Sequence, residues 1–161
     1  FPHFRRIAPF YAINNGLPIT MYGCIFKNNN ELPGEYIDNN IVRRYYSSAV
    51  INLNDTLPSM NELGFISGRI YDVSASGGFI ISDYSKGTEE VFGDSVPMYK
   101  NEEEFVKLVD FYLRNPRLRL EKAKKAREIA LNYTNEKIVT EFEKIFQDLE
   151  SKETNKFHKN L

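Results

Sequence analysis

The stretch that decides the fold is Ser67-Gly-Arg-Ile-Tyr-Asp-Val-Ser-Ala-Ser-Gly-Gly-Phe-Ile-Ile-Ser-Asp83. It predicts a short helix that begins after the N-cap residue Ser67 and ends at Gly77-Gly78, since glycine adopts the left-handed conformation of a helix C-terminus at little cost. Apolar residues that would face a sheet recur at helical spacing: Ile70, Val73 and Ala75. The apolar run at 79–81 then predicts a strand buried on both faces, as parallel strands are.

Polar groups of this stretch gather where open α/β sheets bind ligands, at helix N-termini and at the carboxyl ends of strands. Arg69 lies in the first predicted turn, beside free backbone N–H groups near Ser67 and Gly68, and Asp72 lies one turn later. Asp83 directly follows the strand. A cation, N–H groups and carboxylates at this spacing suit a ligand that carries both phosphate and sugar hydroxyl groups.

The composition is that of an ordinary globular domain: of 161 residues, 42% are hydrophobic and 27% are charged. This length predicts a single domain over residues 1–161. The net charge of −1 argues against a general nucleic-acid-binding protein, which needs a basic surface. No apolar run approaches the ~18 residues of a membrane span. The single cysteine, Cys24, fits a reducing compartment, so we expect a cytoplasmic protein.

Strands alternate with helices on both sides of this stretch, which predicts parallel βαβ units. Upstream we expect helices at 4–16 and 37–46, strands at 19–26 and 49–54, and loops at 27–35 and 55–65. Downstream we expect a loop at 84–90, a strand at 96–99, and helices at 101–114, 117–132 and 135–152. The predicted fold class is α/β, a Rossmann-like open parallel sheet with helices on both faces and a helical C-terminal part.

Two of the predicted helices have clear sequence signals. Asn101 followed by three glutamates is typical of a capped helix N-terminus, and Leu113 is among the residues expected inside. The last helix carries a hydrophobic stripe with helical spacing: Ile138, Phe142, Ile145, Phe146 and Leu149. Such a stripe is core in a compact domain.

Four segments in this order resemble the C-terminal, donor-binding domain of GT-B glycosyltransferases of group 1, in particular the CgeB-like branch. They are residues 45–54, 68–83, 88–92 and 112–116. The step Asn132-Tyr-Thr134 is similar to the His-Thr-Tyr turn of that family, with the histidine missing. The resemblance covers nearly the whole chain.

The resemblance implies a two-domain enzyme that transfers a sugar from a nucleoside-diphosphate donor, with the acceptor brought by an N-terminal domain of the same chain. Asp72 is similar to the second acid of a Glu-x7-Glu pattern that binds the ribose hydroxyls, whereas the first acid would fall at Gly64. Arg69 and the N–H groups at Ser67 and Gly68 would bind the diphosphate. We expect no metal and no other cofactor, and we expect the catalytic groups to lie outside these residues.

The same residues also have simpler interpretations. Arg69 and Asp72 suit a solvated helix face, and Asp83 suits an Asx turn. Thr88 is a natural N-cap, although the resemblance places Thr88 and Glu89 near the donor. A basic cluster suits either solvent or anionic lipid at the inner face of the membrane: Arg114, Arg117, Arg119, Lys122, Lys124, Lys125 and Arg127. The alternative function is a non-catalytic α/β module; an epimerase is a third candidate.

Overall fold

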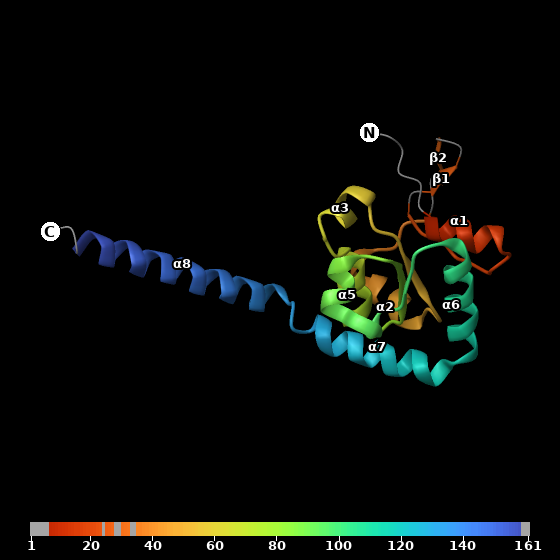
Figure 1. The fold of residues 1–161 in the computed structure, drawn as a ribbon. Coiled ribbons are helices and arrows are strands. Elements are labelled where there is room, and N and C mark those ends of the chain that lie inside the picture. Colours follow the sequence, from red (N-terminus) through yellow and green to blue (C-terminus); the bar gives the residue numbers. More distant parts are fainter. Residues whose placement is uncertain (1–6, 24, 28–29, 33–34, 159–161) are drawn as a thin grey trace.

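The computed structural model describes residues 7–23, 25–27, 30–32 and 35–158. These residues form an α/β body, from which one long helix, α8 (Asn135–His158), extends away (Figure 1). The expected start of the first helix at 4–6 and the single cysteine, Cys24, lie outside the described residues.

A three-stranded parallel sheet forms the centre of the body, in the order β3 (Asn52–Asn54), β4 (Ile80–Asp83), β5 (Met98–Tyr99). Asn54 pairs with Ser82 and Asp83 pairs with Tyr99, so the polar carboxyl ends of all three strands lie at one edge. The predicted α/β class with a parallel sheet is therefore confirmed.

The central strand alternates its side chains between two cores. Phe79 and Ile81 pack on the face covered by α1 (Ile7–Asn14) and α6 (Glu102–Arg114). Ile80 packs on the opposite face, against α4 (Gly68–Ala75) and α7 (Pro116–Ala130). This alternation of period 2 places helices on both faces of the sheet.

The double glycine has two distinct functions. Gly77 adopts φ +80°, the left-handed conformation that ends α4. Gly78 is required for close packing, because a Cβ atom there would lie 2.4 Å from the carbonyl oxygen of Tyr46. Tyr46 belongs to α2 (Asn39–Ser48), a surface helix with no buried residue.

The N-terminal prediction of one strand at 19–26 is wrong. Strand β1 covers only Ile25–Lys27, and it pairs antiparallel with β2 (Asn30–Leu32) in a hairpin outside the main sheet. Gly23, at φ +87°, turns the chain before β1. Residues 19–22 are irregular: Ile19 packs partly buried against the core, whereas Thr20 and Tyr22 are exposed.

Two expected loops contain helices. Residues 55–65 include α3 (Pro58–Glu62), which begins at a proline, a favoured first helical residue. Residues 84–90 fall largely within α5 (Lys86–Phe92), followed by a 3₁₀ turn at Gly93–Ser95. The N-cap position of α5 is Ser85, so the interpretation of Thr88 as N-cap is wrong. Strands β3 and β5 are shorter than expected, and α2 begins two residues later.

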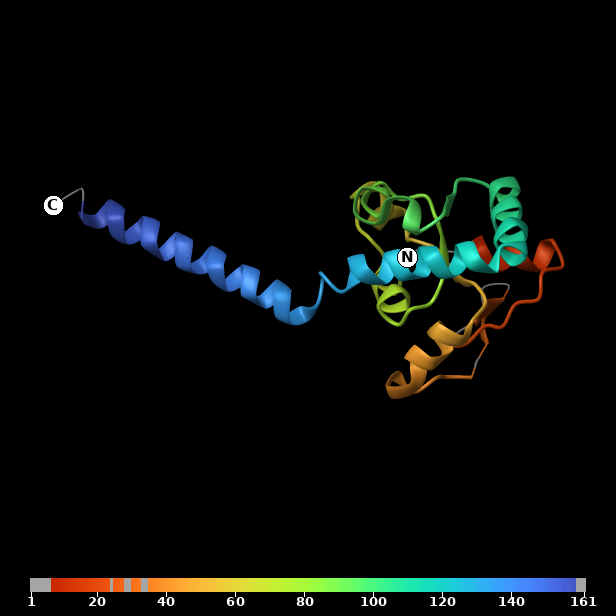
Figure 2. The same cartoon turned by 90° about the horizontal axis from the view of Figure 1, so that it is seen from below.

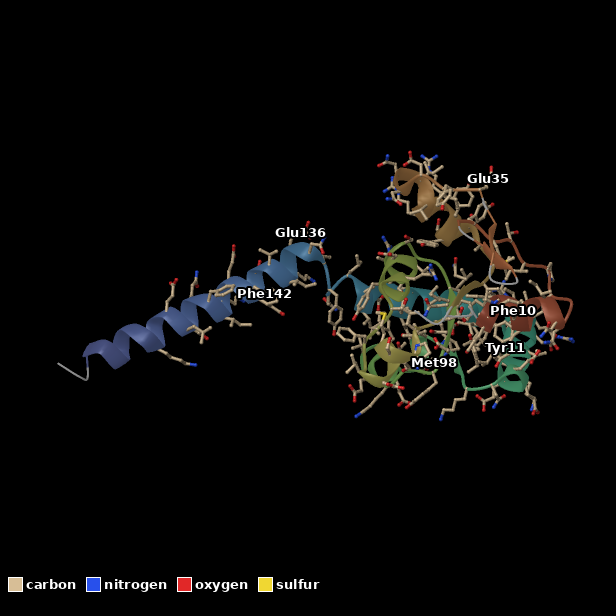
Figure 3. The ribbon with its side chains drawn as sticks, turned by 90° about the horizontal axis from the view of Figure 1, so that it is seen from above. Phe10, Tyr11, Glu35, Met98, Glu136 and Phe142 are labelled. Atoms are coloured by element: carbon tan, nitrogen blue, oxygen red, sulfur yellow. The ribbon has the colours of Figure 1, made fainter. Side chains whose placement is uncertain are left out.

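The C-terminal helices follow the prediction closely. The Asn101 side chain accepts a hydrogen bond from the backbone N–H of Glu104 at 2.9 Å, which confirms the cap of α6. Leu113, expected inside, is 44% exposed. The stripe on α8 is exposed along its whole length, so its expected packing in the core is wrong. Within the described part of the chain no other element lies along α8 (Figure 2), and the side chain of Phe142 projects from it (Figure 3).

Candidate functional site at the carboxyl edge of the sheet

Asp83 is the last residue of the central strand, and the hydrogen bonds from the described residues reach only one of its two carboxylate oxygens. Its Oδ1 atom accepts hydrogen bonds from the Thr56 backbone N–H at 2.9 Å, the Thr56 hydroxyl at 3.1 Å and the Ser82 hydroxyl at 3.0 Å. No hydrogen bond from the described residues reaches Oδ2. The predicted position just past the strand is nearly correct, since Asp83 is the last residue of β4.

Asn54 connects Asp83 to the beginning of α4. Its Nδ2 atom donates to the Ser82 hydroxyl at 2.9 Å, and its Oδ1 atom accepts from the Ser67 hydroxyl at 3.0 Å. Asn54 is 1% exposed and Ser82 is fully buried. A buried hydrogen-bonded chain therefore runs from Ser67 through Asn54 and Ser82 to Asp83.

The first turn of α4 keeps its N–H groups free of a side-chain cap. Ser67 occupies the N-cap position as predicted, but its hydroxyl donates to Asn54 and forms no capping hydrogen bond. Gly68 is exposed and Arg69 is half-buried. An uncapped helix N-terminus with an arginine in its first turn is a suitable environment for an anion.

Arg69 and Asp72 lie on the same short helix without binding one another. Among the described residues, no hydrogen bond or ion pair involves the Arg69 guanidinium or the Asp72 carboxylate. Asp72 is exposed, and only its backbone carbonyl accepts a hydrogen bond, from the Ser76 hydroxyl. Both side chains are therefore available to a ligand, and equally to solvent.

A second carboxylate, Asp55, is buried beneath Asp83. Its Oδ1 atom accepts from the backbone N–H of Ala8, at the start of α1, at 2.7 Å and from the Tyr99 hydroxyl at 3.2 Å. Burial, followed by the nearby negative charges of Asp55 and Asp83, raises the pKa of Tyr99 far above its usual value. The Tyr99 hydroxyl thus stays protonated and acts as a donor.

The electrostatic environment of Asp83 combines opposing effects. Burial raises its pKa, the hydrogen bonds from Ser82 and Thr56 lower it in part, and the charge of Asp55 raises it further. The net pKa is above the usual value for an aspartate. These three donors therefore offset part of the cost of holding an ionised carboxylate at a partly buried position.

The other two predicted residues lie on α5. Thr88 is fully buried, and its hydroxyl has no hydrogen-bond partner among the described residues. Glu89 is exposed and accepts a hydrogen bond from the Tyr84 hydroxyl at 2.8 Å, while the Lys100 ammonium lies 4.5 Å from the centre of the Tyr84 ring. Glu89 therefore stays a candidate at the rim, whereas Thr88 occupies the protein interior.

The structure thus adds to Ser67 and Asp83 a hydrogen-bonded set of polar side chains that sequence reasoning missed. These are Asn54, Thr56, Ser82 and Tyr99. The sequence did contain a signal for them. Two apolar runs that form neighbouring strands are each followed directly by polar residues, at 54–56 and at 82–83. Their partners across the sheet could not be deduced without the strand register.

Other features of the described residues concern metals and membranes. Within these ranges, no three His, Cys, Asp or Glu residues lie close enough together to hold a metal ion. Searching the same residues finds no helix of sufficient length and apolar character for a membrane span. Four residues of the basic cluster bind protein oxygen atoms: Arg114, Arg119, Lys122 and Arg127.

A comparison with protein families places this geometry in context. The model of a family described as glycosyl transferase-like matches residues 6–144. Searches of curated proteins and of solved structures give no significant match. Because the matched region covers most of the 161 residues, the chain belongs to the glycosyl transferase-like family.

Proposed function

We propose that the chain is the donor-binding domain of a GT-B glycosyltransferase of group 1, of the CgeB-like branch. It binds a nucleoside-diphosphate sugar, and the complete enzyme transfers the sugar to an acceptor such as a cell-surface glycan. The observation that carries this proposal is the uncapped N-terminus of α4, with Arg69 in its first turn, which hydrogen bonds through Asn54 and Ser82 connect to the Asp83 carboxylate.

In this proposal each group has a chemical role. The Arg69 guanidinium and the first N–H groups of α4 bind the diphosphate, and they stabilise the negative charge that develops as the nucleoside diphosphate departs. Asp72 and Asp83 accept hydrogen bonds from sugar or ribose hydroxyls, and Glu89 contributes at the rim. This charge stabilisation uses no metal ion.

The remaining parts of the proposal concern partners. We propose that the exposed stripe of α8 is covered by an N-terminal domain of the same protein, since six large apolar side chains in a row rarely face water. They are Ile138, Val139, Phe142, Ile145, Phe146 and Leu149, each 39–62% exposed. The exposed cations Arg117, Lys124 and Lys125 would contact anionic lipid in a cytoplasmic protein bound at the membrane.

Calorimetric titration of the 161-residue chain with UDP, GDP and their sugar conjugates tests the proposal. We expect binding of one nucleotide, and a loss of about 10-fold or more in affinity in Arg69→Ala, the cost of a charge-assisted hydrogen bond. Asp72→Ala should weaken binding less. Arg117→Ala and Glu121→Ala, both exposed on α7, are matched controls that should bind normally. No binding of any nucleotide would contradict the proposal.

A second function, a non-catalytic binding module, is favoured by Gly64. The first acid of the family pattern would fall there, but Gly64 adopts φ +73°, where a side chain is strained. Its carbonyl oxygen also packs so closely on Gly87 that a Cβ atom at 87 would lie 2.2 Å away. If the chain binds no nucleotide but binds another ligand, the non-catalytic function is favoured. Analysis of the reaction products would distinguish the third candidate, an epimerase, from a glycosyltransferase.

A further inference from the structure

The hydrogen bonds to Asp83 are distributed unequally between its two oxygen atoms. Three donors converge on Oδ1: the Thr56 N–H, the Thr56 hydroxyl and the Ser82 hydroxyl. Thr56 is 4% exposed and Ser82 is fully buried. A carboxylate fixed through one oxygen by buried donors keeps the other in a defined direction, as a binding group requires.

The donors are supplied by separate elements, so their arrangement depends on the sheet. Thr56 follows β3, and Ser82 belongs to β4 and is itself oriented by the Asn54 amide at 2.9 Å. To hold the backbone after β3 against Asp83, the hydrogen bond from the Thr56 N–H would be enough. The two hydroxyl groups are additional, and neither donates to a backbone carbonyl among the described residues.

We propose that Thr56 and Ser82 are positioning residues that fix Oδ1 of Asp83 and so present Oδ2, as an ionised acceptor, to a hydroxyl group of the sugar donor. This inference rests on the proposed function. Asn54 supports it indirectly, because its amide holds the Ser82 hydroxyl in place.

The charges around Asp83 make the proposal measurable by pH. Two other titratable groups face it: the Asp55 carboxylate beyond β3 and the Tyr99 hydroxyl on β5. The N-cap residues of α4 and α5, Ser67 and Ser85, are uncharged, and no ion pair within the described ranges includes Asp83. Removal of a hydroxyl donor therefore raises the pKa of Asp83 with no cation to compensate.

The test follows the Asp83 carboxyl by NMR titration in the whole chain, in parallel with the affinity for the nucleotide sugar at pH 5–8. We expect Thr56→Val and Ser82→Ala to raise the Asp83 pKa. Their affinity should fall about fivefold at the acidic end, the value of one hydrogen bond, and recover as the pH rises. Thr56→Ser, which keeps the hydroxyl, should restore both readouts, and Thr20→Val, at an exposed residue, should change neither.

The outcomes separate the inference from the proposed function. An unchanged Asp83 pKa in both Thr56→Val and Ser82→Ala overturns the inference, as does a raised pKa with an unchanged affinity profile. Absence of nucleotide binding by the unmodified chain overturns the proposed function and the ligand role of Asp83 together. If Thr56→Val does not fold, as judged by circular dichroism, the Asp83 pKa and the affinity of Ser82→Ala, compared with those of Thr56→Ser, test the inference instead.

Discussion

Two asparagines on the same strand have different environments at the two edges of the sheet. At the amino edge, the Asn52 side chain donates to the backbone carbonyls of Tyr46 and Phe79, at 2.9 and 3.0 Å. At the carboxyl edge, the Asn54 side chain forms its hydrogen bonds with the side chains of Ser67 and Ser82. A polar residue that satisfies backbone groups stabilises the fold, whereas one that links polar side chains can orient a site.

The largest loss of stability should come from a substitution at the amino edge of the sheet. Gly78→Ala would place a Cβ atom 2.4 Å from the Tyr46 carbonyl oxygen and 2.9 Å from the Asn52 amide nitrogen. Because the first neighbour is backbone, α2 must move, and we expect the free energy of unfolding to fall by about 3 kcal/mol. Urea denaturation measures this; an unchanged midpoint would show that α2 moves freely.

Replacing each asparagine by alanine in turn tests whether the two edges differ in their effect on stability and on nucleotide binding. Asn54→Ala leaves the hydroxyls of Ser67 and Ser82 without their partner, and we expect a loss of about 2 kcal/mol together with weaker nucleotide binding. Asn52→Ala should lower stability but leave nucleotide affinity unchanged in the folded protein.

The exposed Asn39→Ala is the control and should stay within about 0.5 kcal/mol of the unmodified chain. Equal effects of Asn52→Ala and Asn54→Ala on affinity would remove the distinction between the edges.

A smaller effect is expected from Asp83→Asn, and it depends on pH. Because the folded-state pKa of Asp83 is raised, the folded protein holds this proton more tightly than the unfolded chain does. Its contribution to stability therefore falls as pH rises from the unfolded to the folded pKa, and then stays constant. Asp83→Asn lacks this decrease, so its stability relative to the unmodified chain should increase with pH, as thermal melts at pH 3–8 measure.

The opposite trend, with the unmodified chain gaining stability relative to Asp83→Asn as pH rises, would show that hydrogen bonds to Asp83 outweigh the effect of burial and lower its pKa.

The smallest effect concerns Gly68, in the first turn of α4. No atom lies within 4 Å of a Cβ atom built there, and its φ is not positive. Gly68→Ala should therefore raise the free energy of unfolding by about 0.5 kcal/mol, through lower flexibility of the unfolded chain. Comparison with Gly78→Ala in the same denaturation series tests whether the cost of an added methyl group follows the space available at each glycine.

The sequence predicted the body of the fold because its signals were local. The helix from Ser67 to the double glycine, the apolar strand after it and the Asn101 cap each depend on residues close in the chain. The prediction of a strand at 19–26 failed because Gly23, at φ +87°, turns the chain in the middle of the apolar run, and only Ile19 of residues 19–22 packs against the core. Helix α5 was missed because Gly87, needed for contact with Gly64, looks like a loop residue.

The site was predicted only in part for a related reason. Arg69, Asp72 and Asp83 are candidates because of their positions relative to one helix and one strand. Two of the three donors to Asp83 come from Thr56, which follows the neighbouring strand and is 27 residues away in sequence, and the pairing of Asn54 with Ser82 brings Thr56 to Asp83. Such contacts between distant residues leave no periodic pattern in the sequence.

The bare apolar stripe of α8 affects how the protein behaves in a test tube. Where nothing else covers Phe142 and its neighbours, two chains can shield them from water by pairing these helices, so we expect sedimentation at high concentration to show association. A Phe142→Glu substitution should keep the chain monodisperse, and it should leave the ligand chemistry of the sheet edge intact.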